Sequence, residues 1–220
     1  MQDVSARRYL ALWLPFLSAD RWMAASVESA EAPPADAPIV FIEKQRGMLR
    51  LAALSPRVMA MGLAPGIALA NARAIWPDLV TVEHDPVADA RWLAHIADAC
   101  ERYTPATAID PPDAVLLDIT GCAHLLGGEA AMIAAIEEDF DRLHLRCALA
   151  STPEAALALA RHAVTHMQDE AAAVRRLPVA ALRLDGVVET ALRRAGLVTI
   201  GDLADRPTAP LGARFGDAAA

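Results

Sequence analysis

Three aspartates lie close together in the middle of the sequence. Asp110, Asp113 and Asp118 fall within nine residues, and clustered carboxylates are the ligands that hold two metal ions for phosphoryl or nucleotidyl transfer. Side chains alternate between the two faces of a strand, so Asp113 and Asp118, five residues apart, would point to opposite sides. Asp110 and Asp113 flank two prolines, where turn carboxylates commonly cap backbone amides. The spacing therefore predicts at most one of these aspartates at a common metal.

Two other pairs of metal-ligating side chains occur. His162 and His166 are four residues apart on a predicted helix and could share one face, but the residues between them lack the glutamate of the zinc-protease pattern. Cys122 and His124 form a similarly short pair. We predict no metal centre at either place. No Gly-rich phosphate loop followed by Lys and Ser or Thr occurs in the sequence.

The cysteines carry neither a disulfide framework nor a zinc ribbon. Cys100, Cys122 and Cys147 are odd in number and have no Cys-x-x-Cys spacing. We predict that all three are small, buried apolar residues in a reducing compartment.

Composition and charge narrow the function classes. The 220 residues are 55% hydrophobic and 22% charged, with a net charge of −8, which disfavours a protein that coats nucleic acid generally. The charge is unevenly spread: residues 173–215 hold seven arginines against four acids, about +3. The apolar stretches are too short to span a membrane, and no secretory signal precedes them. We expect a cytoplasmic protein.

The elements that must position these residues alternate between strands and helices. Apolar runs predict strands at residues 9–16, 38–43, 48–54, 79–83, 106–109, 114–120 and 145–151. Helices are predicted at 18–27, 56–62, 67–75, 86–103, 129–143 and 152–167. Strands that come in adjacent pairs indicate an α+β fold. After residue 170 only helical signals follow, so we place a domain boundary there.

Two segments resemble the palm of the Y-family translesion DNA polymerases. The string Leu-Asp-Ile-Thr-Gly at residues 117–121, with the Pro-Pro-Asp-Ala-Val-Leu that precedes it, is similar to the family signature Ser-Ile-Asp-Glu-Ala-Tyr-Leu-Asp. Asp113 keeps the aspartate of that signature, but Ala114 stands where the metal-binding glutamate should be. Residues 9–19 look like the first palm strand, with Trp13 at the position of the first metal-ligating aspartate and Pro15 near the second ligand position.

The resemblance extends to the fingers and the thumb. Residues 62–79 resemble the fingers helices, and Pro56 and Met59 stand where the family has the Tyr and Arg that grip the triphosphate. Residues 177–203 look like a thumb with helix-hairpin-helix contacts to DNA, which implies DNA-binding roles for Arg193, Arg194, Gly196, Thr199 and Gly201. The implied domains are a palm from residues 1–18 and 78–170, fingers from 19–77 and part of a thumb from 171–220.

The lost acids and the string Thr-Gly-Cys-Ala-His look like the ImuB branch of this family, whose members are regarded as polymerase-like proteins without synthesis of their own. This resemblance implies a DNA-binding scaffold in DNA-damage-induced (SOS) mutagenesis, located with the nucleoid and needing no metal or other cofactor. It also implies an error-prone C-family polymerase, a RecA-like accessory protein and the sliding clamp as partners. The family plan places a little finger and a clamp-binding peptide beyond residue 220.

Two physical expectations accompany the resemblance. One aspartate cannot hold two Mg²⁺ ions, so we expect Trp13 to pack beside Asp113 and close the former metal site. We also expect weak, salt-sensitive binding of DNA. Two alternatives stay open: an active Y-family polymerase that recruits Glu43 or Asp110 as Mg²⁺ ligands, and an unrelated α+β enzyme.

Overall fold

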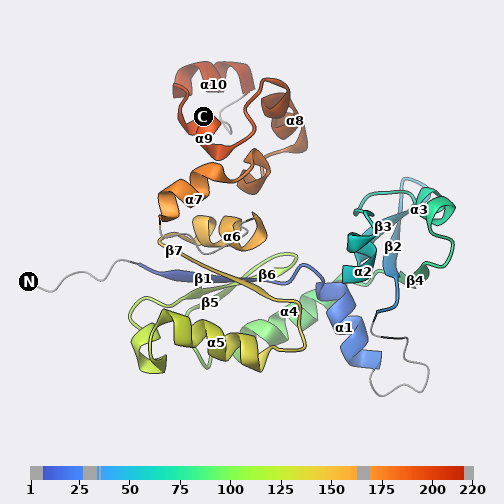
Figure 1. The fold of residues 1–220 in the computed structure, drawn as a ribbon, viewed down its shortest axis with the longest axis horizontal. Coiled ribbons are helices and arrows are strands. Elements are labelled where there is room, and N and C mark those ends of the chain that lie inside the picture. Colours follow the sequence, from blue (N-terminus) through green and yellow to red (C-terminus); the bar gives the residue numbers. More distant parts are fainter. Residues whose placement is uncertain (1–6, 27–33, 35, 163–168, 216–220) are drawn as a thin grey trace, which may run out of the picture.

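A four-stranded sheet, a three-stranded sheet and a group of helices make up the chain (Figure 1). The computed structural model describes residues 7–26, 34, 36–162 and 169–215. The α+β class expected from the sequence is confirmed. In this part of the chain, no helix is both long enough and apolar enough to cross a membrane.

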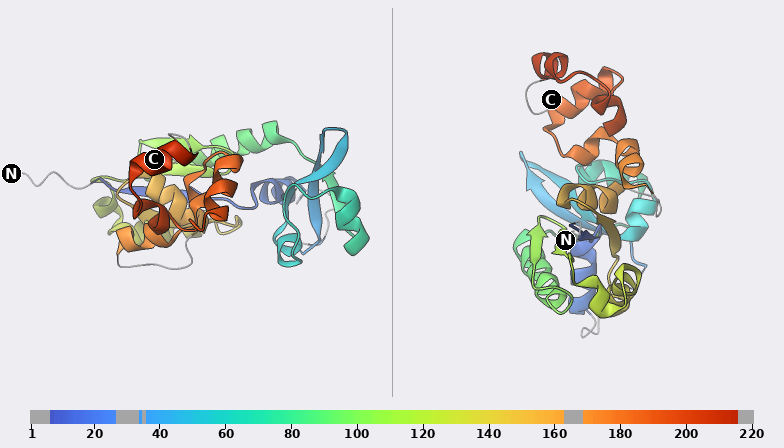
Figure 2. Two further views of the ribbon diagram at one scale, coloured as in Figure 1. Left: turned by 90° about the horizontal axis from the view of Figure 1, so that it is seen from above. Right: turned by 90° about the vertical axis from the view of Figure 1, so that its left-hand side faces the viewer.

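The four-stranded sheet with its covering helices is called the palm below. Its strands lie in the order β5-β6-β1-β7, and every neighbouring pair is antiparallel. Helices α4 and α5 cover one face and α6 covers the other (Figures 1 and 2). The elements are β1 (Tyr9–Trp13), β5 (Thr107–Asp110), β6 (Ala114–Asp118), β7 (Arg146–Ala150), α4 (Pro86–Cys100), α5 (Glu129–Asp139) and α6 (Pro153–His162).

Strand β1 is buried on both faces because its side chains alternate between two cores. Leu10 and Leu12 pack in the core under α4 and α5, whereas Tyr9, Ala11 and Trp13 pack with α6 on the opposite face. This alternation places Trp13 on the α6 face of the palm.

Helix α4 begins and packs as its sequence predicts. The Asp85 side chain accepts a hydrogen bond from the backbone N–H of Ala88, and Pro86 occupies the first turn. Leu93, Ile96 and Cys100 recur at helical spacing and lie buried against the sheet. The helix therefore packs on the face of the palm sheet opposite α6.

The three-stranded sheet, called the fingers below, consists of β2 (Ile39–Gln45), β3 (Met48–Leu54) and β4 (Val80–Glu83), with α2 (Pro56–Ala60) and α3 (Leu69–Ile75) packed against it. Strands β2 and β3 form the predicted hairpin. Residues 78–83 were expected in the palm, but β4 pairs parallel with β2 in the fingers sheet. The physical reason is the short connection from α3, which brings β4 to the open edge of β2, where Leu79 joins the fingers core.

Helix α1 (Leu17–Ser26) connects the two sheets (Figure 1). Phe16, Ala19 and Trp22 pack with Ile39 and Phe41 of the fingers. The helix also lies against α4 of the palm. It thus serves as the bridge between palm and fingers.

Residues 169–215 contain only helical elements, as predicted, and are called the thumb below. They are α7 (Glu170–Arg176), the 3-10 helix η2 (Val179–Leu182), α8 (Gly186–Arg194), α9 (Ile200–Ala204) and α10 (Thr208–Phe215). Ala173 and Leu177 pack in the same core as α6. The thumb therefore lies on the α6 side of the palm sheet, opposite α4 and α5 (Figures 1 and 2).

Candidate functional site

The end of β1 and the start of β6 meet at the centre of the palm. Trp13 lies opposite Ala114 in the antiparallel register, and its indole Nε1 donates a hydrogen bond of 2.8 Å to Asp113 Oδ2. On the other side of β1, Trp13 faces Arg146 of β7, whose guanidinium lies 5.2 Å from the centre of the indole ring. An aromatic side chain thus occupies the position where the Y-family resemblance implies a metal-ligating aspartate.

The second oxygen of Asp113 is also engaged. Arg161 of α6 donates from Nη2 to Asp113 Oδ1 at 2.9 Å and to Asp110 Oδ2 at 2.7 Å. The Arg161 side chain is only 12% exposed. Burial by itself would lower the pKa of Arg161, but the hydrogen bonds to Asp113 and Asp110 outweigh it, so its pKa lies above the usual value. The guanidinium stays charged and neutralises this pair of carboxylates.

A second guanidinium reaches the same place from the thumb. Arg183 Nη1 donates to Asp110 Oδ2 at 2.7 Å, and Nη2 donates to the carbonyl oxygen of Pro111 at 3.1 Å. Sequence reasoning missed Arg161, Arg146 and Arg183, because each comes from a different element and no local pattern marks it. We call Trp13, Asp110, Asp113, Arg161 and Arg183 the palm network.

This arrangement does not fit a pair of Mg²⁺ ions. Both Asp113 oxygens accept hydrogen bonds from the protein, and Ala114 is fully buried and offers no oxygen from its side chain. Asp110 lies near Asp113 but is bonded to two arginines. Glu43 lies in the fingers strand β2 with its Oε2 3.9 Å from His84 Nδ1. Among the described residues, no group of three or more metal-ligating side chains is arranged to hold a metal ion.

A cleft of about 560 Å³ opens between palm and fingers next to the palm network. Pro15 and Asp113 line its palm wall, and Met59 lines its fingers wall. Pro56 begins α2, and the cleft lining does not include it. Within the described chain, the lining contains no Lys or Arg and consists mainly of apolar side chains. It therefore lacks the Lys and Arg side chains that commonly bind phosphate groups.

A buried polar cluster lies in the wall of this cleft. Asp89 of α4 accepts hydrogen bonds of 2.6 Å from Ser18 Oγ and from Arg21 Nε, and its Oδ2 lies 3.1 Å from His84 Nε2. These residues tie α1 to α4 and to the end of β4. Burying a carboxylate demands such partners, so we assign the cluster a structural role at the junction of palm and fingers.

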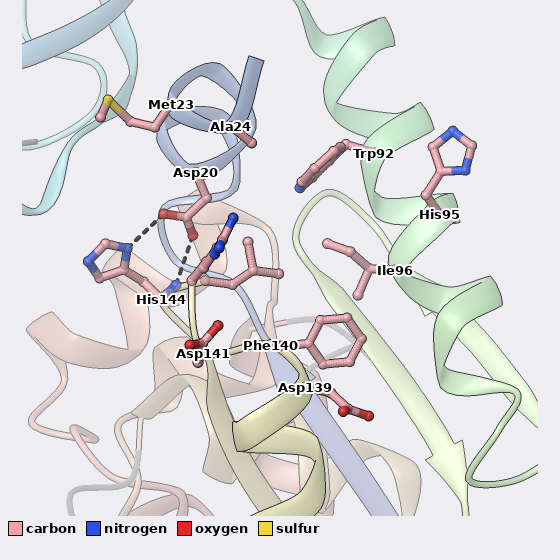
Figure 3. A pocket seen from close by; sticks show the side chains of 12 residues that line it. Asp20, Met23, Ala24, Trp92, His95, Ile96, Asp139, Phe140, Asp141 and His144 are labelled. Carbon is pink, nitrogen blue, oxygen red and sulfur yellow. Dashed lines mark hydrogen bonds and ion pairs between the residues drawn. The ribbon is translucent and has the colours of Figure 1, made fainter. Parts of the chain in front are cut away.

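Another cavity, of about 720 Å³, lies between α1, α4 and the end of α5 (Figure 3). Trp92, Ile96 and Phe140 line it with apolar surface. At its edge Asp20 accepts a 2.9 Å hydrogen bond from the backbone N–H of His144 and lies 2.7 Å from His144 Nδ1. Burial raises the pKa of Asp20, although His144 opposes the shift. This contact joins α1 to the loop before β7.

The thumb presents its predicted DNA-facing residues on a helical hairpin. Arg193 and Arg194 are exposed at the end of α8, and Gly196 makes the turn with φ of +82°. Thr199 begins α9 with a capping box to Asp202. Gly201 is buried, and a Cβ at this position would lie 2.9 Å from the backbone oxygen of Arg175. Gly201 therefore allows α9 to pack closely on α7.

Where the structure describes them, the remaining candidates form no group of three metal-ligating side chains. Cys100 is buried as predicted, whereas Cys122 and Cys147 are partly buried. Burial raises the pKa of Cys100 and of Cys147 to about 12, so both thiols stay protonated. Burial also lowers the pKa of His162, and His166 lies outside the described residues.

Comparisons with known proteins agree with this fold. Residues 21–161 match the family model described as the impB/mucB/samB family. The chain is 47% identical over 165 residues to Protein ImuB of Caulobacter vibrioides strain NA1000 / CB15N, a match covering 72% of this chain and 36% of that protein. The chain therefore spans about a third of the length of the curated relatives it matches.

Solved structures of polymerases share the fold at low sequence identity. DinB from Sulfolobus solfataricus aligns with a TM-score of 0.70 and 13% identity, covering 96% of this chain and 64% of its own. An insertion ternary complex of Dbh DNA polymerase aligns with a TM-score of 0.73 and 12% identity over the same shares. A Dbh chimera described as a Y-family DNA polymerase also has a TM-score of 0.73, with 12% identity and the same coverage. The expected Y-family fold is confirmed.

Proposed function

Because this chain belongs to the impB/mucB/samB family, we propose that it is a polymerase-like protein that binds DNA and acts as a scaffold in mutagenesis after DNA damage, without catalysing synthesis. The observation that carries this proposal is the palm network. Asp113, the aspartate kept from the family signature, is bonded through both oxygens to Trp13 and Arg161. A metal ion at Asp113 would therefore have to compete with both of these donors for the carboxylate.

The electrostatics of the centre support the same proposal. Nucleotidyl transfer needs several anionic oxygens around two Mg²⁺ ions, because the metals stabilise the attacking and the leaving oxygen together. Here guanidinium groups neutralise Asp110 and Asp113. The adjoining cleft, in its described lining, provides no Lys or Arg side chain for a triphosphate.

Binding of DNA is proposed for the thumb. Arg193 and Arg194 are exposed beside the Gly196 turn, and the solved relatives include a ternary and a binary complex of Dbh DNA polymerase. From the ImuB likeness we also propose three protein partners: an error-prone C-family polymerase, a RecA-like accessory protein and the sliding clamp. We propose that it works in the cytoplasm, at the nucleoid.

Primer extension tests the absence of synthesis. Purified chain, a primed template, dNTPs and Mg²⁺ should give no extension, whereas robust synthesis by the unmodified chain would overturn the proposal in favour of an active polymerase with Asp110 as a ligand. The variant Trp13→Asp with Ala114→Glu restores two acids, and any extension that it gains should disappear when Asp113→Asn is added. Circular dichroism must first show that the variant folds, because Ala114 is fully buried.

A further inference from the structure

Arg183 joins the thumb to the palm from an unusual backbone conformation. It ends η2 with φ of 52° and ψ of 37°, in the left-handed region that residues other than glycine seldom adopt. Its guanidinium bonds to the Asp110 carboxylate and to the Pro111 carbonyl, both in the palm. A strained residue is retained where its surroundings hold it, and here these two palm contacts do so.

The palm end of this connection is more buried than its thumb end, because the Arg161 side chain is 12% exposed and that of Arg183 is 50% exposed. Asp110 shares its Oδ2 between Arg183 and Arg161, and Arg161 continues to Asp113, which Trp13 also contacts. The hydrogen bonds thus run without a break from the thumb to the first strand of the palm. Such connected networks hold geometry more firmly than isolated surface pairs.

The apolar contact between thumb and palm leaves a gap beside this connection. Ala173 and Leu177 pack α7 and its end on the palm side, but a cavity of about 470 Å³ remains between α6 and the thumb, with Leu182 and Arg183 in its lining. Helix α7 and Ala181 of η2 are therefore held by apolar packing, whereas the contacts of Arg183 with the palm, just before α8, are polar.

We propose that Arg183 is a positioning residue, which fixes α8 and the Gly196 turn relative to the palm through Asp110 and so sets where Arg193 and Arg194 meet DNA. Arg183 lies three residues before α8 begins. Because α8 has nine residues, a tilt of roughly 10° at its start moves its far end by about 2 Å. The carboxylates left at the former metal centre then serve to place the thumb. This inference rests on DNA binding by the thumb as proposed above.

Asp110→Asn separates positioning from simple electrostatics. The change removes one negative charge from a chain of net charge −8, so electrostatics alone would strengthen binding to DNA phosphates. If Asp110 holds Arg183 in place, binding to a fluorescent primer–template should instead weaken roughly fivefold at low salt, because a preorganised surface is lost. Hydrogen exchange should increase in η2 and α8 but not in β1.

Asp205→Asn is the matched control. Asp205 also pairs with an arginine, Arg175, but both residues lie within the thumb. Its loss changes the charge equally and leaves the connection to the palm intact, so DNA binding should be unchanged or slightly tighter.

Changes at Arg183 complete the test. Arg183→Asn removes the guanidinium with a residue that tolerates the left-handed region, and it should reproduce the exchange pattern of Asp110→Asn. Arg183→Lys keeps the charge without the planar fork that bonds both palm acceptors. Its hydrogen exchange in η2 and α8 should lie between that of the unmodified chain and that of Arg183→Asn.

These experiments distinguish a failure of the positioning role from a failure of the proposed DNA binding. If Asp110→Asn binds DNA as tightly as Asp205→Asn and leaves exchange in η2 and α8 unchanged, the positioning role is wrong. If the unmodified chain binds no DNA even at low salt, the proposed DNA-binding function fails. Unchanged exchange in the Arg183 variants would still refute the link to the palm in that case.

Discussion

At the scale of single residues, the carboxylates of the palm centre are balanced by side chains of the protein itself. Carboxylates that crowd together need cations, and a metal ion or a guanidinium can supply the positive charge. Here Arg161 provides it from α6, and the Trp13 indole adds a neutral donor from β1. The protein's own side chains therefore supply the partners that these aspartates need.

Replacing Arg161 with Met should destabilise the protein, because Asp110 and Asp113 would lose their shared, mostly buried partner. We expect a loss of about 2 kcal/mol in the free energy of unfolding, measured by urea titration. Arg57→Met is the control: its pair with Asp36 is exposed and should contribute less than about 1 kcal/mol. Equal small losses for the two variants would contradict the structural role of Arg161.

Arg8 and Glu129 predict a dependence of stability on pH. Arg8 Nε and Nη2 each donate to one oxygen of Glu129, at 2.7 and 2.9 Å, and these hydrogen bonds hold the pKa of Glu129 below its usual 4.5. The folded state therefore binds this proton less readily than the unfolded state. The stabilisation is complete above pH 4.5 and is lost as the pH falls through the lower folded value.

Glu129→Gln should consequently be less stable than the unmodified chain at pH 7, with the difference narrowing as the pH falls below 4.5. Thermal unfolding followed by circular dichroism at a series of pH values measures this convergence. Glu154→Gln, at an exposed position in the first turn of α6, serves as the control. A constant difference at every pH would disprove the linkage.

At the scale of secondary-structure elements, the thumb depends on one close approach of two helices. Helix α9 reaches α7 at Gly201, where a Cβ would lie 2.9 Å from the backbone oxygen of Arg175. Backbone atoms cannot move aside as the end of a flexible side chain can. The position therefore requires glycine for packing.

Gly201→Ala should destabilise the thumb by about 1–3 kcal/mol, the usual cost of overpacking. Hydrogen exchange measures the effect locally: it should become faster in α7 and α9 of the variant and stay the same in β1 and β6. Gly186→Ala is the matched control, because nothing lies within 4 Å of a Cβ there and its φ is not in the left-handed region. Gly186→Ala should be neutral or slightly stabilising, and an equal loss in both variants would refute the packing argument.

At the scale of the whole molecule, charge is separated along the chain. Residues 173–215 carry about +3, while the chain as a whole carries −8. The acidic remainder repels nucleic acid, whereas the net positive charge of residues 173–215 attracts it. Affinity for DNA should therefore depend on few contacts and be sensitive to salt.

Anisotropy titrations with primer–template DNA should give a Kd of about 1 μM or weaker near 0.15 M salt, and the affinity should fall steeply as the salt concentration increases. Replacing Arg193 and Arg194 together with Ala should reduce the slope of log K against log salt by up to about 2. Arg57→Ala with Arg73→Ala removes the same charge from the fingers and should leave the slope unchanged. Tight binding that is insensitive to salt would contradict this electrostatic account.

The sequence by itself determined the elements and the chemical deficit of the palm. Period-two and helical apolar spacing located the strands and the helices up to α6, because these patterns are local, whereas beyond residue 170 they indicated only helical structure. The residue types at positions 13 and 114 were enough to predict that a two-metal centre lacks ligands. The sequence predicted the strand at residues 79–83 but not its partner, since the pairing of β4 with β2 depends on which sheet edge is open in space.

Only the tertiary structure decided what neutralises the remaining aspartates. Arg161 and Arg183 are 48 and 73 residues away in sequence from Asp113 and Asp110, respectively. Their contact with these acids depends on how α6 and the thumb pack on the palm. A periodic pattern records which face of an element is buried and carries no information on which distant charge will meet it, so this pairing could be read only from the folded chain.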